Sequence, residues 1–414
     1  MSKSLLDRFL SKTVVKGRLD VTYADGRHVH FGQPVEGYPD IAIRFADSRV
    51  PRDVIASPRL GAGEAYKDGR IIIEKGDVMS FVQLVQANRA WEQGVDLGNP
   101  TALRRARDRL RYAIRSFNKP GGSRRNVSHH YDIGNALYRL MLDEEHMQYS
   151  CGYWPREGMT LGEAQEAKLA HIAAKLALEP GQRVLDIGCG WGGMAIYLAG
   201  KFEVEVLGIT LSHEQLTLAN ERAEAAGVAG RARFELVDYR DLGRRGLTFD
   251  RIVSVGMFEH VGVPQYETFF RACANLLSED GVMLLHTIGR LDGPSWTDAF
   301  TDKWIFPGGY IPALSETVAA SEKVRLALTD LEILRFHYAK TLREWYRRCM
   351  EHRDEIVEMY DESFFRLWTF YLSGATASFE SGGMVNFQLQ YARSRRTLPI
   401  TRGYIDDAEA KLAG

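Results

Sequence analysis

A glycine-rich stretch directly after an apolar run carries the strongest chemical signal in this sequence. Residues 184–193 read VLDIGCGWGG, which predicts a strand, a tight turn and the first turn of a helix. Glycines at such a turn let a ligand approach the backbone at the N-terminus of the helix. The spacing of Gly188, Gly190 and Gly193 also satisfies the dinucleotide pattern, so the stretch alone fits either NAD or S-adenosylmethionine.

The residues around this loop favour S-adenosylmethionine. A nicotinamide site favours an acidic residue at the end of the second strand, about 20 residues onward, but the run at 205–210 ends in Thr210 and is followed by Leu211. Asp186, just before the glycines, suits a cationic or amine-bearing ligand, and Asp238 ends the third strand, where it could meet an adenine amine. We therefore expect S-adenosylmethionine in this loop.

Four more side chains are of types that act as acids, bases or nucleophiles, but each also has an ordinary structural interpretation. Cys151 lies in QYSCGYW (148–154) with no basic residue beside it, and a free thiol among aromatic side chains often packs as a small hydrophobe. Glu259 could be a solvated residue in a first helical turn, while His286 and Tyr338 could simply be buried. Residue type and local context leave both interpretations open.

The composition excludes several classes of protein. A chain of 414 residues allows two or three domains. With 53 Lys and Arg against 54 Asp and Glu, the net charge is -1, so no whole-chain field attracts nucleic acid, and we expect no nucleic-acid partner. The four cysteines are scattered, without a C-x-x-C pair or an apolar secretory segment. We therefore expect no metal site, no disulfide framework and a cytoplasmic location.

No apolar run approaches the roughly 20 residues that cross a bilayer. From about residue 180, strand and helix patterns alternate instead. Apolar runs of strand length occupy 183–188, 205–210, 233–238, 250–256 and 281–289, and helical patterns cover 213–227 and 263–281. This alternation predicts an α/β fold with right-handed crossovers and a doubly wound parallel sheet.

The first hundred or so residues predict a smaller mixed α+β domain. Short β-rich runs at 18–32, 40–47 and 69–77 are separated by turn residues, and 81–91 has a helical pattern. Nothing in this part has the spacing of a catalytic site. We interpret it as a binding or packing module.

A basic amphipathic helix is predicted over 101–125. Its six arginines from Arg104 to Arg115 are balanced by a single acidic residue, Asp108. Such a helix can dock on its own domain or adsorb to an anionic membrane surface. The K-P-G-G-S run that follows ends the helix. The sequence thus predicts an N-terminal domain over 1–118, associated with lipid or membrane, and a catalytic domain over 119–414.

A series of motifs resembles the cyclopropane-fatty-acyl-phospholipid synthase family, in the order seen there. They are HHYDIGNALYRLMLD (129–143), QYSCGYW (148–154), VLDIGCGWGG (184–193), GITLSHEQ (208–215), VSVGMFEHVG (253–262), HTIG (286–289), FPGGYIP (306–312) and Tyr338 followed by LREWY (342–346). The resemblance covers roughly 120–400 and implies a class I methyltransferase fold. The lead domain is also similar to that of the phospholipid-acting members, whereas the mycolic acid branch lacks so long a lead.

The resemblance also assigns roles to residues. It implies that S-adenosylmethionine is bound by the side chains and loop residues Tyr149, Ser150, Asp186, Gly188, Cys189, Gly190, Gly192, Thr210 and Gln215, with Asp238 and Tyr239 at its adenine. Members of the family hold a bicarbonate ion as the base that closes the ring. The matching residues here are Cys151, Glu259, His286, Ile288 through its backbone N–H, and Tyr338.

The expected reaction adds a methylene group from S-adenosylmethionine to the cis double bond of an unsaturated phospholipid acyl chain. The expected partners are that phospholipid, an anionic membrane surface on the inner face, and a second copy of the chain. Two alternatives stay open at this point. A related enzyme could form methyl-branched or methyl-olefinic chains, and a non-catalytic lipid-binding protein could keep a vestigial core.

Overall fold

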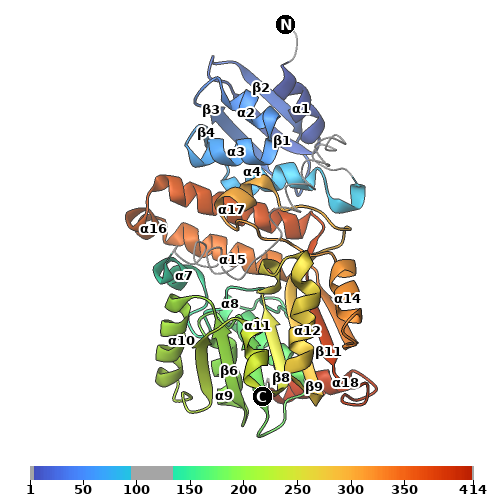
Figure 1. Cartoon of the computed structure of the whole chain (residues 1–414). Coiled ribbons are helices and arrows are strands. Elements are labelled where there is room, and N and C mark those ends of the chain that lie inside the picture. Colours follow the sequence, from blue (N-terminus) through green and yellow to red (C-terminus); the bar gives the residue numbers. More distant parts are fainter. Residues whose placement is uncertain (1–3, 95–133, 413–414) are drawn as a thin grey trace. The chain divides into compact units, whose positions relative to one another are not determined.

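The computed structural model describes residues 4–94 and 134–412 (Figure 1). The predicted basic helix over 101–125 and the predicted boundary between residues 118 and 119 lie outside these ranges. Among the described residues, none of the helices combines the length and the apolar character needed to span a bilayer.

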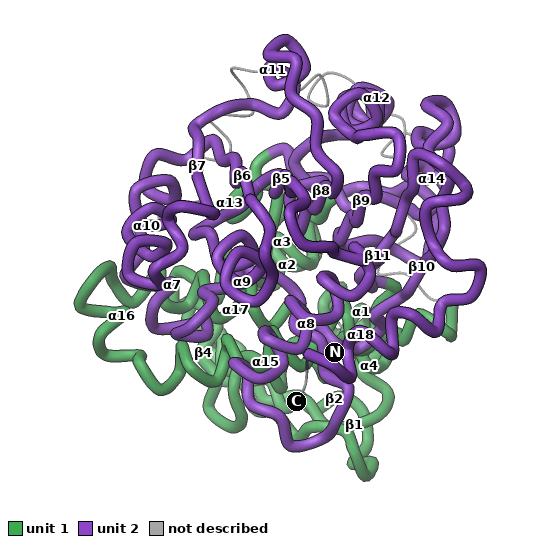
Figure 2. Tube along the Cα trace, turned by 90° about the horizontal axis from the view of Figure 1, so that it is seen from below, with its two compact units in different colours: residues 1–107, 297–307, 339–383 green, residues 108–296, 308–338, 384–414 purple. Residues whose placement is uncertain are grey.

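The chain folds into two compact units, shown in green and purple in Figure 2. Unit 1 holds residues 1–107, 297–307 and 339–383, and unit 2 holds 108–296, 308–338 and 384–414. The sequence predicted two consecutive domains, whereas 297–307 and 339–383 join the N-terminal residues. Aromatic side chains explain why these two segments belong to unit 1. The ring centroids of Phe300 and Phe370 lie 4.9 Å apart, and a Cβ on Gly63 would touch both rings.

Unit 1 is a small mixed α+β structure. Its elements are α1 (Leu5–Thr13), β1 (Gly17–Thr22), β2 (His28–Gln33), β3 (Asp40–Phe45), α2 (Val50–Ala56), α3 (Pro58–Lys67), β4 (Ile71–Lys75), α4 (Val78–Ala87), η1 (Trp91–Gln93), α13 (Ala299–Trp304), most of α15 (His337–Glu351), α16 (Arg353–Met359) and α17 (Glu362–Glu380). Its sheet has the order β2-β1-β3-β4, in which only β1 and β3 pair in parallel.

The helix predicted over 81–91 is present but displaced toward the N-terminus. Asp77 caps α4, since its carboxylate accepts a 2.7 Å hydrogen bond from the backbone N–H of Ser80. Side chains of this type stabilise the first turn by satisfying an unpaired N–H. The helix therefore begins at Val78. It ends at Ala87.

Unit 2 contains the predicted doubly wound sheet. Its elements are α7 (Asn135–Met141), α8 (Leu161–Leu176), β5 (Arg183–Ile187), α9 (Gly193–Lys201), β6 (Glu205–Thr210), α10 (His213–Ala225), β7 (Ala232–Leu236), α11 (Tyr239–Leu242), η2 (Gly243–Arg245), β8 (Phe249–Val255), η3 (Phe258–His260), η4 (Val263–Gln265), α12 (Tyr266–Leu276), β9 (Leu277–Arg290), α14 (Leu314–Glu322), β10 (Ala327–Leu334), β11 (Met384–Ala392) and α18 (Gly403–Leu412).

The seven strands are ordered β10-β11-β9-β8-β5-β6-β7, and β11 runs antiparallel to both of its neighbours. The other pairs are parallel. Apolar side chains of α8, α9 and α10 pack on one face of the sheet, and those of α11, α12 and α14 pack on the other. Figure 1 shows this arrangement around β6, β8 and β9. The predicted α/β class is confirmed, and the sheet order adds the two strands β10 and β11.

Candidate functional site

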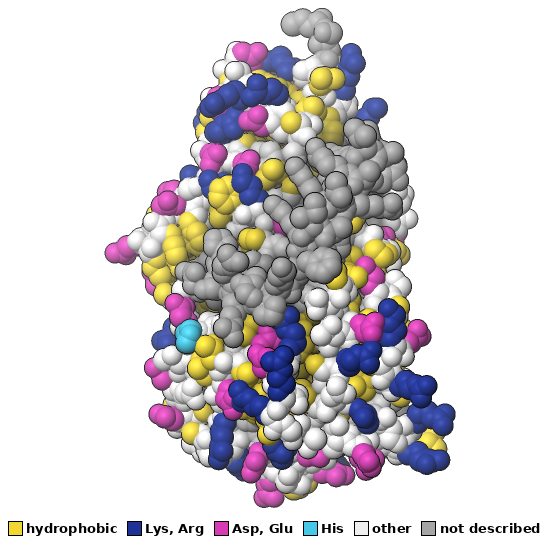
Figure 3. All heavy atoms as spheres, in the orientation of Figure 1, with side chains coloured by type: hydrophobic (Ala, Val, Ile, Leu, Met, Phe, Trp, Pro, Cys, Tyr) yellow, Lys and Arg dark blue, Asp and Glu magenta, His cyan; other side chains and the backbone are white. Residues whose placement is uncertain are grey.

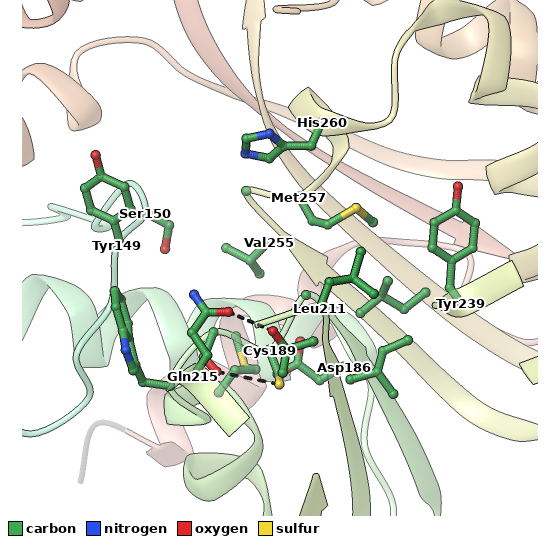
Figure 4. Close-up of a pocket in the computed structure, with 18 of the residues that line it drawn as sticks. Tyr149, Ser150, Asp186, Cys189, Leu211, Gln215, Tyr239, Val255, Met257 and His260 are labelled. Carbon is green, nitrogen blue, oxygen red and sulfur yellow. Dashed lines mark hydrogen bonds between the residues drawn. The ribbon is translucent and has the colours of Figure 1, made fainter. Parts of the chain in front are cut away.

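A pocket opens where β5, β6, β7 and β8 end at their carboxyl edge. Open parallel sheets bind ligands at this edge because the loops and helix N-termini meet there. Its wall includes Met147, Gln148, Tyr149, Ser150, Asp186, Gly188, Cys189, Gly190, Trp191, Thr210, Leu211, Gln215, Asp238, Tyr239, Arg240, Met257 and His260. Figure 4 shows Tyr149 and Ser150 on one side of the pocket and Tyr239 on the opposite side.

The glycine loop has the backbone conformation that its sequence predicted. Gly188, Gly190 and Gly192 have φ angles of 82°, 55° and 80°, a region that disfavours other residues. A Cβ on Gly188 would lie 2.8 Å from Met257, but a Cβ on Gly190 would meet no protein atom within 4 Å. Gly188 is thus needed for packing, whereas the space beside Gly190 is open to a ligand.

Asp186 is buried at the pocket with its charge incompletely compensated. Its side chain is 2% exposed, and its Oδ2 has no hydrogen-bond partner among the described atoms. Burial raises its pKa to about 7, and Lys168 opposes this rise. A donor group on a ligand would satisfy the carboxylate. This orphaned oxygen and the open space at Gly190 fit the amine, the hydroxyls and the cationic sulfur of S-adenosylmethionine.

Except for Gly192, the remaining predicted cofactor residues line the same pocket. A Cβ on Gly192 would lie 2.7 Å from Phe234. Thr210 donates a 2.7 Å hydrogen bond to Oε1 of Gln215, so these two side chains orient each other. Asp238 differs from the expectation, because Arg240 already donates to its carboxylate, at 2.8 Å from Nε. The expected contact of Asp238 with an adenine amine stays a prediction and would have to share the carboxylate with Arg240.

Glu259 forms a second buried acidic site after β8. The backbone N–H of Ile288 donates a 2.6 Å hydrogen bond to its Oε1, while its Oε2 is buried without a partner among the described atoms. Its own carbonyl accepts a 3.0 Å hydrogen bond from the backbone N–H of Tyr310. Burial raises the pKa of the Glu259 carboxyl to about 7. Two of the predicted base-site residues, Glu259 and Ile288, are therefore in direct contact.

His286 lies in the sheet between two amide side chains of β11. Gln388 approaches its Nδ1 at 3.2 Å and Asn386 approaches its Nε2 at 3.4 Å. Burial lowers the pKa of His286 to about 3, so the ring is neutral. A neutral imidazole has one N–H donor and one acceptor nitrogen, and an amide can present either its NH₂ group or its oxygen. One amide must therefore present its oxygen to the ring, which makes Asn386 and Gln388 the residues that select the tautomer.

Cys151 and Tyr338 are both buried in unit 2. His337, just before Tyr338, accepts a 2.8 Å hydrogen bond from the backbone N–H of Trp154. The start of α15 thus lies beside the segment that carries Cys151. Burial raises the pKa of the Cys151 thiol well above its usual range. This is the behaviour of a neutral thiol that packs or donates, because a nucleophilic cysteine needs a lowered pKa.

The sequence predicted no basic neighbour for Cys151, but the fold provides one. Lys168 of α8 is completely buried, and its ammonium opposes the rise in the pKa of Cys151. Sequence reasoning also missed Gln148, Met257, Asn386 and Gln388. The only available signal for the two amides was their alternation on one face of a strand, which by itself does not separate a buried face from an exposed one. Among the residues described, no group of three His, Cys, Asp or Glu side chains has a metal-binding arrangement.

The sheet order, the glycine loop and the buried acid at its base define a class I S-adenosylmethionine-dependent methyltransferase. The comparisons with known proteins lead further. Residues 119–389 match the family model described as mycolic acid cyclopropane synthetase, and residues 5–90 match a domain of unknown function (DUF7884). The chain belongs to the mycolic acid cyclopropane synthetase family.

Individual relatives agree with this assignment. The chain is 38% identical over 365 residues to the cyclopropane-fatty-acyl-phospholipid synthase of Escherichia coli K12, covering 87% of this chain and 90% of the relative. It is 31% identical over 402 residues to a tuberculostearic acid methyltransferase of Mycobacterium tuberculosis, covering 94% and 90%. The solved structure of the mycolic acid cyclopropane synthase CmaA1 complexed with SAH and CTAB is similar with a TM-score of 0.61 and 33% identity, covering 65% of this chain and 98% of that one. The protein is thus an S-adenosylmethionine-dependent enzyme, either a cyclopropane fatty acid synthase or a lipid methyltransferase.

Proposed function

We propose that this enzyme transfers a methylene group from S-adenosylmethionine to the cis double bond of an unsaturated acyl chain in a membrane phospholipid, forming a cyclopropane ring. The observation that carries the proposal is the buried Glu259 carboxylate of η3, which accepts a hydrogen bond from the N–H of Ile288 on β9, the strand that also carries the neutral His286. Methyl transfer to the alkene leaves a carbocation, and ring closure requires a base that removes a proton from the transferred carbon, whereas a methyl-olefinic product loses its proton from a neighbouring carbon of the chain. The match to the E. coli relative, which is named for this reaction, covers most of both chains.

S-adenosylmethionine supplies an electrophilic methyl group when bound. Asp186 would accept hydrogen bonds from the polar groups of S-adenosylmethionine. The glycine loop would let the cofactor approach the backbone of Gly190. An isolated alkene is a weak nucleophile, so the pocket must hold it in line with the methyl group and exclude water. The buried walls formed by Met257 and Trp191 serve this exclusion.

Bicarbonate supplies a base that is small enough for a pocket that also accepts an acyl chain. A bare carboxylate facing such a chain would be costly to bury, whereas an anion held by several donors would not. Glu259 Oε2, buried without a partner in the described structure, could accept the hydroxyl of this ion. Cys151, His286 and Tyr338 would complete its shell, and the Ile288 N–H would have to be shared with Glu259 Oε1, to which it already donates.

Deuterium labelling tests the proposal and separates it from its alternative. Incubation with CD₃-labelled S-adenosylmethionine and vesicles of an unsaturated phospholipid should give lipids that retain two deuterium atoms and resist ozonolysis, because the transferred carbon loses one deuteron. Both alternative products would retain three deuterium atoms; a methyl-olefinic chain would stay sensitive to ozonolysis, and a methyl-branched chain would resist it. This second outcome remains a candidate because of the similarity to the tuberculostearic acid methyltransferase. Unaltered lipids would overturn both.

Access to a phospholipid requires contact with a membrane, and the arginines at 104–115 are the proposed contact. On the face shown in Figure 3, basic and acidic side chains are interspersed over the described surface. We therefore assign adsorption to the membrane to a local basic segment rather than to the net charge of the whole chain. We also propose a homodimer, which sedimentation equilibrium would test as a species of twice the chain mass.

A further inference from the structure

A fully buried lysine stands directly behind the cofactor pocket. Lys168 of α8 is 0% exposed, and its Nζ donates to Oε1 of Gln148 and, at 3.0 Å, to Oγ of Ser150. Both acceptors line the pocket, whereas Lys168 itself does not. Burying an ammonium group is costly unless its partners compensate for the lost water. The proposed reaction gives this lysine no role of its own.

Gln148 connects Lys168 with the end of the glycine loop. Its Nε2 donates a 3.2 Å hydrogen bond to the carbonyl of His146, which fixes the amide with Oε1 toward Lys168. Gln148 also packs on the first residue of α9, since a Cβ on Gly193 would lie only 2.4 Å from Nε2 of Gln148. A shift of Gln148 would therefore disturb the helix N-terminus that follows the loop.

Ser150 is held in the same way from the same helix. Gln165, one turn before Lys168, donates 2.9 Å and 3.3 Å hydrogen bonds to the carbonyls of Ser150 and Gln148. A serine hydroxyl has one hydrogen to donate and can accept as well. Because the hydroxyl oxygen of Ser150 accepts a hydrogen bond from Lys168, its hydrogen is directed to another group. Ser150 lines the pocket, so a ligand in the pocket can accept that hydrogen (Figure 4).

Lys168 also acts on the charge of the pocket. Its ammonium lowers the pKa of Asp186 against the larger effect of burial. The other titratable groups that interact electrically with Lys168 are Asp143, His146, Cys151 and His286. Burial lowers the pKa of Lys168 itself to about 7. Only its charged form favours the ionised Asp186, which is the form that accepts hydrogen bonds from a cationic ligand.

We propose that Lys168 is a positioning residue of the S-adenosylmethionine site and that it sets cofactor affinity by fixing Gln148 and Ser150 without touching the cofactor. This inference rests on the assignment of the pocket to S-adenosylmethionine.

Lys175 offers a matched control on the same helix. It lies two turns after Lys168, is also 0% exposed, and its Nζ pairs with Glu332 and Asp330 instead of the pocket wall. Replacing either lysine by methionine removes a buried charge from α8 and keeps most of the side-chain volume. The two variants should therefore lose similar stability, and only Lys168→Met should alter the pocket.

The experiment is calorimetric titration of S-adenosylmethionine into the full-length parent, Lys168→Met and Lys175→Met, with thermal unfolding of each. We expect Lys168→Met to weaken cofactor binding by at least about tenfold, the scale of a lost hydrogen bond to a charged group, and to raise the cofactor KM while leaving the lipid KM nearly unchanged. Lys175→Met should stay within about twofold of the parent in cofactor affinity. Lys168→Gln, which keeps a donor without the charge, should recover part of the loss and replaces Lys168→Met if the latter does not fold.

The outcomes separate the inference from the proposed function. A parent that does not bind S-adenosylmethionine would refute the assignment of the pocket and the inference with it. A parent that binds, together with Lys168 variants of equal affinity, would overturn the inference alone. Equal weakening by Lys168→Met and Lys175→Met would also overturn it, because it would reduce Lys168 to a structural residue.

Discussion

Glu259 is the side chain on which the proposed proton transfer depends most directly. Glu259→Gln keeps the size of the group and the hydrogen bond from Ile288 but removes an anionic acceptor. Product formation should fall by at least roughly a hundredfold, the usual scale for a positioned acid–base group, while the affinity for S-adenosylmethionine should change little. Rates measured with unsaturated phospholipid vesicles test this.

Glu267→Gln is the matched control, because Glu267 is a carboxylate of α12 that forms a surface ion pair with Arg271. It should act at the parental rate. A Glu259→Gln enzyme that turns over as fast as this control would exclude Glu259 from the base site.

The stability of the ligand-free protein should also report the state of Glu259. Its folded pKa of about 7 is above the ordinary value of 4.5, so the folded state holds the proton more tightly than the unfolded state. The stabilising contribution of the protonated form is complete below about pH 4.5 and is lost as the pH rises through about 7. Glu259→Gln cannot ionise, so its unfolding free energy relative to the parent should increase over this window, by up to about 3 kcal/mol. Denaturant unfolding at several pH values measures the difference, and a constant difference would contradict the burial of an ionisable Glu259.

Cys151 can be distinguished as a site wall or a nucleophile by one substitution. Cys151→Ser keeps a small group that donates and accepts hydrogen bonds, and burial of Cys151 favours the neutral thiol. We expect this variant to retain part of the activity. A variant without activity, together with an alkylated cysteine in the parent detected by peptide mass analysis, would replace the bicarbonate mechanism by covalent catalysis.

The turn between β5 and α9 is the element that should decide cofactor binding. Gly190→Val places a side chain where no protein atom lies within 4 Å, at a φ of 55°. The space it fills is the proposed cofactor site, so S-adenosylmethionine binding should fall below detection by calorimetry while the protein stays folded.

Gly227→Val controls for the backbone strain of that substitution. Gly227 follows α10, has a φ of 69° and also has no protein atom within 4 Å of an added Cβ. Both substitutions carry a similar conformational cost of roughly 1–2 kcal/mol, but only Gly190→Val should abolish binding. If both variants bind S-adenosylmethionine equally well, the loop assignment is wrong.

At the scale of the whole molecule, the proposed function requires a soluble cofactor and a membrane-borne acyl chain to meet. Replacing Arg105, Arg109 and Arg111 by glutamine should weaken binding to anionic vesicles and flatten its dependence on salt, because each basic side chain near such a surface contributes about 1 kcal/mol. Affinity for free S-adenosylmethionine should be unchanged. Vesicle sedimentation over a range of salt concentrations measures the effect.

The control for this prediction removes the same charge elsewhere. Arg231, Arg233 and Arg244 are exposed in unit 2, and their replacement by glutamine should leave vesicle binding close to that of the parent. Equal partitioning of both triple variants and the parent would return the segment 101–125 to a role in packing on its own domain.

The amino-acid sequence by itself determined the nature of the cofactor loop and most of the strands that support it. The VLDIGCGWGG stretch predicted β5, its tight turn and α9, because local backbone requirements are written directly in glycine positions. The five apolar runs predicted β5 to β9 for a similar reason, since strands buried on both faces are continuously apolar. The motif order further predicted the family, and ten of the eleven residues that it implies for the cofactor line one pocket.

Only the tertiary structure decided which polar side chains are buried. Helix α8 contains Lys168 and Lys175, and β11 carries Asn386 and Gln388, all of which are buried. Periodicity tells that such side chains share one face, but it does not tell whether water or another element covers that face. Here the contacting partners lie in other segments, since Gln148 is 20 residues from Lys168 and Gln388 is 102 residues from His286. Their charges and tautomers are set by packing between distant segments, which no local stretch of sequence records.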